Sequence, residues 1–232
     1  MQVFKALTPV QAISFDLDDT LYNNKPVIAA AEAAMLQSLA RHAPITQGYD
    51  SEYWWQQRLL LAKLQPAIRH DMGRWRLLAV EAGLVTLGLA QCEAAEVAEL
   101  AYDAFWQART TISIKAEVKA LLIRLASRYQ LIAITNGNAC IHRMGLGDLF
   151  EFSLQAGPDG RMKPYRDLFI VAAQRLQLQP QQILHIGDSH RADVLGALNA
   201  GCQAAWLDHH HAAVSVLPHI RLTDVQQLIA LC

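Results

Sequence analysis

Three carboxylates lie within four positions of one another near the start of the chain, directly after a short apolar run. The stretch is ISFDLDDTLY (Ile13–Tyr22), and its acidic residues are Asp16, Asp18 and Asp19. Carboxylates this close repel one another, and each loses favourable solvation when it leaves water. A divalent cation would relieve that repulsion, and Mg²⁺ prefers oxygen ligands. The spacing therefore indicates a hard-cation site, with helix capping by loop aspartates as the alternative.

Two further polar clusters follow apolar runs in the second half of the chain. Thr135 and Asn136 come at the end of YQLIAITN, and Asp188 follows QILHIG, with Asp193 a few positions later. The carboxyl ends of parallel strands meet at one edge of a sheet, so we expect these groups to converge with the first acidic cluster. Lys163 lies in a Lys-Pro turn between them, and together with the Thr135 hydroxyl and backbone N–H groups it would cradle a phosphate. Each cluster alone also fits an ordinary turn or helix cap; their order and strand context together favour one site.

The elements that must position these groups alternate between strands and helices. The apolar runs that predict buried strands are Ala12–Phe15, Tyr129–Thr135, Glu151–Gln155, Gln182–Ile186 and Gln203–Leu207. The helices predicted in the same part of the chain are Lys115–Arg128, Tyr165–Leu176, Ala192–Ala200 and Val225–Leu231. This alternation is typical of parallel βαβ units.

The middle of the chain has a different character, being rich in Ala, Leu, Gln and Glu. Its predicted helices are Val27–His42, Ser51–Leu64, His70–Leu87 and Cys92–Arg109, and they are interrupted at Pro44, Gly48, Pro66 and Gly88. We therefore expect an α/β fold: a Rossmann-like, doubly wound parallel sheet formed by residues 1–23 and 110–232, with an inserted helical domain at 24–109.

Composition narrows the class of protein. The chain has 232 residues, of which 53% are hydrophobic and 18% charged, and this composition is typical of a globular protein. Its formal net charge of -1 argues against nucleic acid and anionic lipid as partners. No signal peptide is evident, and no apolar run reaches the roughly 18 residues that a membrane helix needs. Four cysteines without metal-ligand spacing fit reduced thiols in the cytoplasm, where we expect a monomer or small homo-oligomer.

Taken together, the polar clusters resemble the motifs of the haloacid dehalogenase-like hydrolase superfamily along nearly the whole chain. The correspondence runs through DxDxT at Asp16–Thr20, the threonine Thr135, the lysine Lys163, and GDxxxxD at Gly187–Asp193. The helical insert between the first two motifs matches the family's cap domain. The resemblance implies Mg²⁺-dependent hydrolysis of a small-molecule phosphate monoester.

The resemblance also implies a role for each acidic residue. Asp16 would attack phosphorus and form an aspartyl-phosphate, which splits one difficult displacement into two. Asp18 would protonate the leaving oxygen and then activate the hydrolytic water. Mg²⁺ would be held by Asp16, the backbone carbonyl of Asp18 and Asp188, with Asp193 orienting the metal site from behind.

The remaining motif residues are assigned in the same way. Thr135, the amide of Asn136 and Lys163 would hold the phosphoryl oxygens. Family members that cleave carbon–halogen bonds lack the second aspartate and need no metal, so Asp18 favours phosphate esters. For Asp19 we expect a solvated or capping role.

The segment IRHDMGRWR (Ile68–Arg76) resembles the flavin mononucleotide phosphatase branch, whose members also take a phosphorylated ribitylaminouracil precursor of riboflavin. Its candidate substrate-binding residues are Arg69, His70, Arg74, Trp75 and Arg76. Planar rings stack on Trp or Arg, so the chemistry is compatible. The competing interpretation is that these aromatic residues pack helix against helix.

Other functions remain open at this stage. A nucleotide or sugar-phosphate phosphatase of the same fold would use the same motifs, and a non-catalytic phospho-ligand binding protein is a third reading. The run His209–His211 offers transition-metal ligands, although a loop is the favoured interpretation. For His185 we expect a packed residue rather than a ligand.

Overall fold

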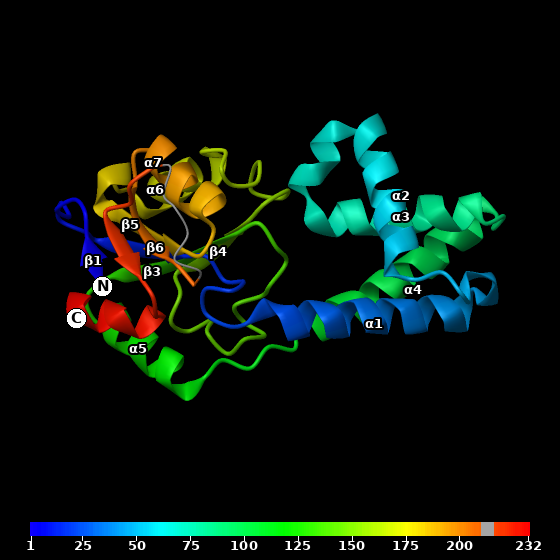
Figure 1. Cartoon of the computed structure of the whole chain (residues 1–232), viewed down its shortest axis with the longest axis horizontal. Helices are drawn as coiled ribbons and strands as arrows, with labels where there is room; N and C mark the ends of the chain where they lie inside the picture. Colours follow the sequence, from blue (N-terminus) through cyan, green and yellow to red (C-terminus); the bar gives the residue numbers. More distant parts are fainter. Residues whose placement is uncertain (210–215) are drawn as a thin grey trace. The chain divides into compact units, whose positions relative to one another are not determined.

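The structure is a computed structural model that describes residues 1–209 and 216–232. The chain divides into two compact units. Met1–Asn23 and Ser113–Cys232 together form the first, which we call the α/β unit, and Asn24–Ile112 forms the second, the helical unit (Figure 1). The two ends of the chain therefore build one unit, and the segment between them builds the other.

The described residues of the α/β unit form a seven-stranded sheet in the order β1-β7-β6-β5-β2-β3-β4. The strands are β1 (Gln2–Val3), β2 (Ala12–Phe15), β3 (Gln130–Thr135), β4 (Phe152–Gln155), β5 (Ile183–Gly187), β6 (Gln203–Leu207) and β7 (Ile220–Leu222). Every neighbouring pair is parallel except β1 and β7, which pair antiparallel at the edge. β2, which precedes the first acidic cluster, lies between β3 and β5.

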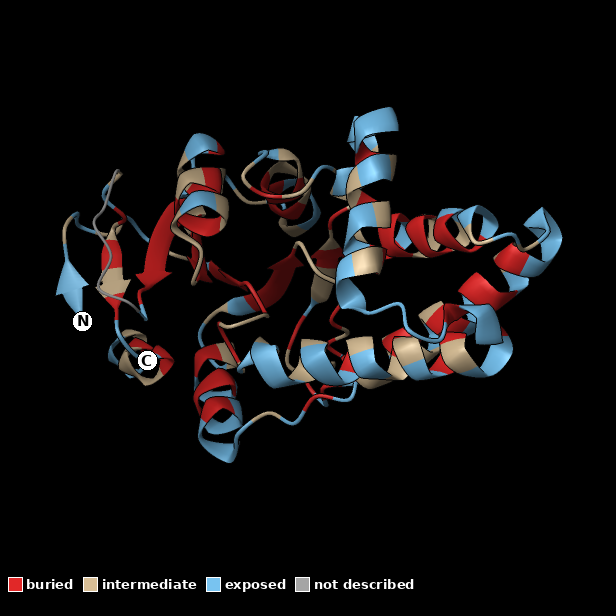
Figure 2. Ribbon diagram, turned by 45° about the vertical axis from the view of Figure 1, so that its right-hand side comes forward, coloured by how far each residue is buried: buried red, intermediate tan, exposed pale blue. Residues whose placement is uncertain are grey.

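Helical segments cover both faces of this sheet, so its central strands read as continuous apolar runs. On one face, α6 (Asp167–Leu176) and α7 (Gly196–Asn199) bury side chains such as Phe169 against the sheet. On the other lie α5 (Ala116–Ala126) and the 3₁₀ segment Val225–Leu231 (Figure 1). Figure 2 shows the resulting pattern, with buried strands between helices whose outer sides are exposed. The fold is thus the doubly wound α/β sheet that the sequence predicts.

Three details of this unit differ from the sequence-based prediction. The helix predicted at Ala192–Ala200 is a wider π-helical turn, His190–Leu195, followed by the short α7. π turns occur frequently at functional sites, and Asp193 in this turn directs its carboxylate inward. Val225–Leu231 is a 3₁₀ helix, and β1 and β7 were not predicted because strands of two and three residues carry no periodic signal.

The helical unit consists of α1 (Asn24–His42), α2 (Ser51–Leu64), α3 (Met72–Thr86) and α4 (Gln91–Arg109), with short 3₁₀ turns at Pro44–Thr46 and Pro66–His70. α1 packs along α4, and α2 packs on α3. Its core is formed by buried residues of all four helices, among them Met35, Trp54, Leu84 and Phe105. Among the described helices, none combines the length and the apolar character needed to cross a lipid bilayer.

The ends of these helices are fixed by side chains. Asp50 caps α2 by accepting from the backbone N–H groups of Glu52 and Tyr53, at 3.1 and 3.2 Å, and α2 has the predicted bounds. Asp71 caps α3, so this helix begins after His70 rather than at it. The sequence-based prediction ended the helical insert at residue 109, whereas the helical unit of the structure extends to Ile112.

Candidate active site

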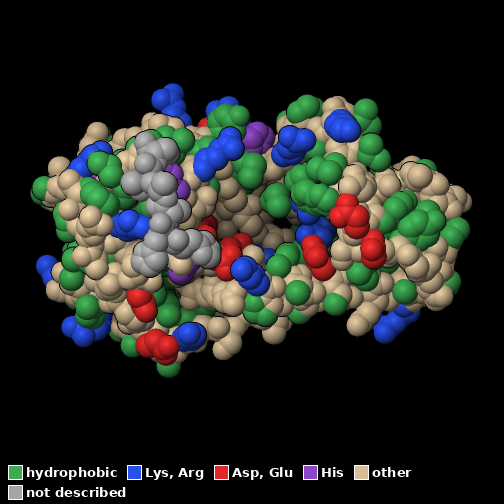
Figure 3. All heavy atoms as spheres, viewed as in Figure 1, with side chains coloured by type: hydrophobic (Ala, Val, Ile, Leu, Met, Phe, Trp, Pro, Cys, Tyr) green, Lys and Arg blue, Asp and Glu red, His purple; other side chains and the backbone are tan. Residues whose placement is uncertain are grey.

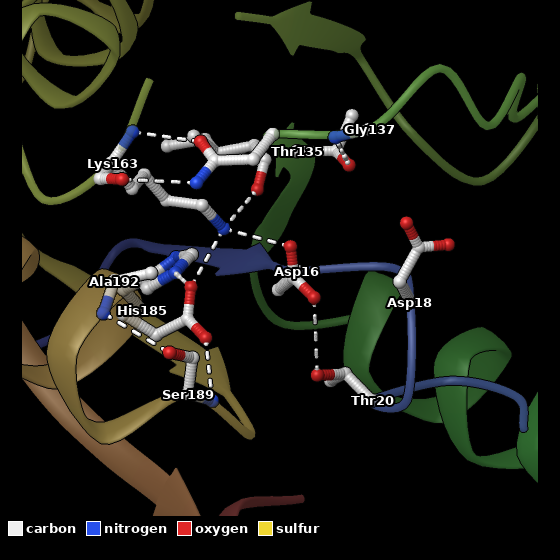
Figure 4. A network of polar contacts seen from close by, with 12 residues as sticks. Asp16, Asp18, Thr20, Thr135, Gly137, Lys163, His185, Ser189 and Ala192 are labelled. Atoms are coloured by element: carbon white, nitrogen blue, oxygen red, sulfur yellow. Dashed lines mark hydrogen bonds and ion pairs between the residues drawn. The ribbon is translucent and has the colours of Figure 1, made fainter. Parts of the chain in front are cut away.

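The polar residues that follow β2, β3 and β5 lie at one edge of the sheet. In the parallel register, Phe15 of β2 pairs with Ala133 of β3 and with Ile186 of β5. Asp16 therefore leaves β2 beside the ends of both neighbours, and its backbone N–H donates to the carbonyl of Ile186 at 2.8 Å. Because the strands are parallel, the residues after all three meet at this edge, as Figure 4 shows for Asp16, Thr135 and their neighbours.

Lys163 is the centre of the polar network at this edge (Figure 4). Its side chain is almost completely buried, and its Nζ donates to Asp16 Oδ1 at 2.8 Å, Asp193 Oδ1 at 2.6 Å and the carbonyl of Ile134 at 2.6 Å. An ammonium group has three protons, so each one has an acceptor. Asn136 fixes the lysine backbone: its Oδ1 accepts from Lys163 N at 2.7 Å, and its Nδ2 donates to Lys163 O at 2.9 Å.

Burial and charge pull the pKa values of this network in opposite directions. Burial acts to lower the pKa of Lys163, but the charges of Asp16 and Asp193 outweigh it and raise that pKa. Burial acts to raise the pKa of Asp193, but Lys163 and the hydrogen bond from His185 hold it below its usual range. Burial raises the pKa of Asp16 well above its usual range; Lys163 opposes this rise, while Asp193 and Asp18 add to it. The ionised form of Asp16 is therefore less stable here than in water, even with Lys163 beside it.

Carboxylate oxygens of Asp16, Asp188 and Asp193 lie within 4.8 Å of one another, close enough to surround one metal ion. Asp193 is already engaged, because its Oδ1 bonds Lys163 and His185 and its Oδ2 accepts from Ser189 N at 2.9 Å. Burial, with the charge of Asp193, raises the pKa of Asp188 to about 6. The surroundings of Asp16 and Asp188 thus destabilise their ionised forms, and a nearby cation would offset this effect. Their carboxylate oxygens are the kind of ligand that Mg²⁺ prefers.

Asp18 lies on the far side of Asp16 from Lys163 (Figure 4). Its Oδ1 accepts a hydrogen bond from the Tyr22 hydroxyl. Thr20 Oγ1 is 3.4 Å from Asp16 Oδ2, and this contact helps to orient that carboxylate. Asp18 is therefore close to the anionic cluster but outside the lysine network.

Thr135 is buried at the end of β3, and its Oγ1 accepts from the backbone N–H of Gly137 at 3.0 Å. This bond shapes the turn after β3. Asn136, in that turn, was predicted to act through its backbone amide, and the structure adds the side-chain bonds that anchor Lys163.

His185 and Ser14 are members of the network that sequence reasoning did not assign to it. His185 was predicted as a packed residue; it is buried against Phe169, and it also bonds Asp193 Oδ1 through Nε2 at 3.1 Å and Ser14 Oγ through Nδ1 at 2.8 Å. Burial lowers its pKa to about 4, so the ring is neutral near pH 7. A neutral ring beside a carboxylate donates through Nε2 and accepts from Ser14 at Nδ1. The contact between the two residues could have been predicted only from the register of β2 and β5, which pairs Ser14 with His185.

Gly187 is required by the close approach of Asp193. A Cβ at position 187 would lie 2.2 Å from Asp193 Cγ, so any other residue there would force the Asp193 side chain or the backbone to shift. The glycine of the GD pair therefore lets Asp193 reach the lysine.

Asp19 adopts a left-handed backbone with φ of 54°, and its carbonyl accepts from His209 Nε2 at 2.8 Å. Its carboxylate is not part of the metal-sized cluster found among the described residues. His210 and His211 lie outside the described residues.

The candidate substrate residues of the helical unit separate into two sets. Arg69 and Arg74 are exposed and His70 is partly exposed, whereas Trp75 and Arg76 are buried. Trp75 Nε1 donates to the backbone carbonyl of residue 58 at 2.8 Å, and the Arg76 guanidinium lies 3.9 Å from the Phe105 ring centre. The two buried side chains therefore belong to the interior of the helical unit.

Comparison with known proteins decides the family. The family described as "Hydrolase: haloacid dehalogenase-like hydrolase" matches residues 10–201. The chain belongs to this family. Among curated haloacid dehalogenase-like relatives, it is 36% identical over 237 residues to the 5-amino-6-(5-phospho-D-ribitylamino)uracil phosphatase YigB of Escherichia coli (strain K12), covering 100% of both chains. It is 27% identical to the phosphoserine phosphatase of Thermus thermophilus, covering 94% of this chain and 98% of that protein.

A solved structure of the same family also matches nearly the whole chain. The 2-haloacid dehalogenase from Pseudomonas syringae pv. tomato DC3000 superimposes with a TM-score of 0.90 at 33% sequence identity, covering 95% of this chain and 97% of that one. Family membership and the relatives that act on phosphate esters identify the chain as a phosphatase.

Proposed function

We propose that this phosphatase is Mg²⁺-dependent, that it works through an aspartyl-phosphate on Asp16, and that its substrate is 5-amino-6-(5-phosphoribitylamino)uracil or flavin mononucleotide. The observation that carries the proposal is the buried contact of Asp16 with Lys163, beside Asp188 and the engaged Asp193. The full-length similarity to a ribitylaminouracil phosphatase supports the choice of substrate.

In the first step an Asp16 carboxylate oxygen bonds to phosphorus while the bond from phosphorus to the ester oxygen breaks. Lys163, through its contact with Asp16, and the Thr20 hydroxyl orient this carboxylate for attack. Asp18 gives its proton to the departing ester oxygen. Mg²⁺ held by Asp16, Asp188 and the backbone carbonyl of Asp18 would supply positive charge to the phosphoryl oxygens.

In the second step a water oxygen bonds to phosphorus, and the bond from phosphorus to Asp16 breaks. Asp18, now ionised, takes the proton of that water. Thr135, the Asn136 amide and Lys163 are the groups assigned to the phosphoryl oxygens. Lys163 donates all three of its protons to protein acceptors. It therefore contacts the substrate by replacing one of these hydrogen bonds with a hydrogen bond to a phosphoryl oxygen, and its charge stabilises Asp16 in both steps.

Asp18 supports phosphate-ester hydrolysis over cleavage of a carbon–halogen bond. A halide leaves without a proton, so such an enzyme has no use for a second acid, whereas an alkoxide leaving group needs one. The similarity to a structure described as a 2-haloacid dehalogenase therefore supports the shared fold more than a shared reaction. Nucleotide and sugar-phosphate monoesters are the alternative substrates.

A small molecule is the partner that fits this chain. On the face shown in Figure 3, Lys and Arg side chains are interspersed with Asp and Glu among the described residues, and no large patch of one sign is visible. This distribution agrees with the formal net charge of -1 and supports recognition of the substrate by local groups.

The test begins with a general aryl phosphate, assayed in Mg²⁺ and in EDTA. We expect hydrolysis in Mg²⁺, loss of activity in EDTA, and recovery when Mg²⁺ is restored. Next, kcat/KM is measured across the two proposed substrates, nucleoside monophosphates and sugar phosphates. We expect the two proposed substrates to rank first; a rank at or below the median for both would reject the substrate assignment but not the phosphatase.

A further inference from the structure

Trp206 lies on β6, beside the strand that leads to the candidate metal ligand Asp188. It is only 3% exposed, and it pairs with Gly187 of β5 in the parallel register. Its indole Nε1–H donates to the backbone carbonyl of Asp188 at 2.8 Å. The tryptophan thus bonds the main chain of a residue whose carboxylate lies in the metal-sized cluster.

The peptide group between Asp188 and Ser189 is held at both of its polar atoms. Its carbonyl accepts from Trp206, and its N–H, which belongs to Ser189, donates to Asp193 Oδ2 at 2.9 Å. A trans peptide group is planar, with its C=O and N–H on opposite sides of the chain, so the two bonds together oppose its rotation. Holding this plane fixes the ψ angle of Asp188, and the pairing of Gly187 fixes the chain before it. The direction of the Asp188 Cα–Cβ bond is therefore set by these backbone contacts.

Two neighbouring side chains hold the indole of Trp206 in place. The His190 ring packs against it edge to face, with the ring centres 4.9 Å apart, and the Arg221 guanidinium lies 5.4 Å from its ring centre. His190 is fixed in turn, because its Nε2 donates to the backbone carbonyl of Val216 at 2.9 Å. The indole N–H is therefore a donor whose position the surrounding side chains determine.

We propose that Trp206 is a positioning residue of the metal site: by holding the backbone carbonyl of Asp188, it directs the Asp188 carboxylate toward the ion. This role rests on the proposed function, in which Asp16 and Asp188 hold Mg²⁺, and extends it. An indole N–H can only donate, so Trp206 supplies no metal ligand and acts through the Asp188 backbone. Groups that orient metal ligands typically change metal affinity by about 10–100-fold when they are replaced. The role is therefore large enough to measure as a binding constant.

The first test measures the Mn²⁺ affinity of the metal-free full chain without substrate, from the electron paramagnetic resonance signal of the free ion. Mn²⁺ takes the same oxygen ligands as Mg²⁺. Trp206→Phe keeps an aromatic ring and removes the N–H, and we expect it to weaken binding about tenfold. An affinity equal to that of the wild type would overturn the proposal.

Trp75→Phe is the matched control for this test. Trp75 is 5% exposed, and its Nε1 donates to the backbone carbonyl of Arg58 at 2.8 Å, so the variant loses the same kind of buried hydrogen bond inside the helical unit. We expect it to bind Mn²⁺ as tightly as the wild type. An equal loss of affinity in the two variants would trace the effect to a general loosening of the protein and overturn the proposal.

A double-mutant cycle separates positioning of Asp188 from packing of the indole. Asp188→Asn removes the carboxylate that Trp206 directs, and we expect it to weaken Mn²⁺ binding more than about tenfold. In this background Trp206→Phe should lower the affinity by less than about a further twofold, because no carboxylate remains at position 188. A tenfold loss in both backgrounds would assign Trp206 to packing alone and overturn the proposal.

A measurement on the wild type decides the matter if Trp206→Phe does not fold. NMR of the ¹⁵N-labelled protein follows its five indole N–H signals during a titration with Mg²⁺, each signal being assigned by replacing the other tryptophans in turn. We expect the Trp206 signal to shift as Mg²⁺ binds and the Trp75 signal to stay in place. A Trp206 signal that stays in place while Mg²⁺ binds would overturn the proposal.

The same titrations distinguish failure of this role from failure of the proposed function. Metal binding that depends on Asp188 but not on Trp206 would reject the positioning role and leave the proposed Mg²⁺ site intact. A wild type that binds neither Mg²⁺ nor Mn²⁺, or that binds them equally well as Asp188→Asn, would reject the proposed Mg²⁺ site and the positioning role together.

Discussion

The two units of this protein bury charge in opposite ways. In the α/β unit, each proton of the buried Lys163 ammonium has an oxygen acceptor, and Asp193 accepts from three donors. In the helical unit, and among the residues that the structure describes, the buried Arg58 guanidinium has no carboxylate within salt-bridge distance and its Nε has no acceptor. The first arrangement satisfies every proton of its buried cation, whereas the second leaves at least one buried donor without an acceptor among the described residues.

Burial of a charged side chain does not by itself tell how much that side chain contributes to stability. Lys163 and Arg58 are both buried, but removing the lysine leaves two buried carboxylates without their cation. Removing the arginine, which has no carboxylate partner among the described residues, takes away a desolvation cost. Variants of the two units should therefore respond differently, and the predictions below run from the largest expected effect to the smallest.

The largest effect is expected for Asp16→Asn, because the amide retains the shape of the carboxylate and loses its nucleophilicity. We expect kcat for an aryl phosphate to fall by about 10⁴-fold or more. Asp19→Asn is the matched control: its carboxylate is outside the metal-sized cluster, so kcat should stay within about twofold. Equal losses in the two variants would show that general negative charge, rather than one nucleophile, drives the reaction.

Lys163→Met should lower the free energy of unfolding by about 3–5 kcal/mol, because Asp16 and Asp193 lose the cation between them. Urea unfolding in EDTA measures this loss without interference from metal. Arg161→Met is the control, since Arg161 is exposed and its ion pair with Asp167 is screened by solvent, so the loss should be much smaller. A loss below 1 kcal/mol in Lys163→Met would contradict the paired-charge account.

The neutral His185 makes the α/β unit sensitive to acid. Its pKa is about 4 when folded and near 6.5 when unfolded, so between these values the unfolded chain binds more protons and stability falls as pH drops. The loss from this group is on the order of 3 kcal/mol from pH 6.5 to 4. Asp193 and Lys163, which face the ring, have pKa values shifted away from this window.

His185→Gln is the variant that tests this prediction, since its amide can still donate toward Asp193 but does not titrate. We expect its unfolding free energy, measured by urea at several pH values, to fall less steeply between pH 6.5 and 4 than that of the wild type. Parallel slopes for the two proteins would mean that other groups govern the acid sensitivity.

The smallest effect on stability is expected for Arg58→Met. The variant removes a buried guanidinium that has no carboxylate within salt-bridge distance among the described residues, and it keeps an apolar side chain between Trp55 and Trp75. The unfolding free energy should therefore change by less than about 1 kcal/mol or rise. Urea unfolding without ligand is the measurement. A loss of 3 kcal/mol or more, comparable to Lys163→Met, would erase the distinction between the two units.

The strands from β2 to β6, and the polar residues that follow β2, β3 and β5, could be predicted from the sequence. Ala12–Phe15 and Gln203–Leu207 have the predicted bounds, because strands buried on both faces read as unbroken apolar runs. Since parallel strands end at a common edge, the convergence of the clusters after β2, β3 and β5 followed from their order.

Contacts that depend on register or on the direction of a side chain were not accessible. Ser14 meets His185 only because β2 and β5 pair in one register, and nothing near either residue in the sequence specifies that pairing. The anchoring of Lys163 by the Asn136 side chain likewise joins loops far apart in the chain. Arg58 attracted no notice, because an arginine in a helix is usually exposed.

The central claim is that Asp16 forms a covalent bond to phosphorus. The direct measurement is acid quenching within one turnover of the wild type with Mg²⁺ and substrate, followed by mass spectrometry of the peptide that carries Asp16. The account predicts that this peptide gains the mass of one phosphoryl group early in the turnover and loses it as phosphate is released, with no gain in Asp16→Asn. Full hydrolytic activity in Asp16→Asn, or a phosphoryl group found only on another residue, would contradict it.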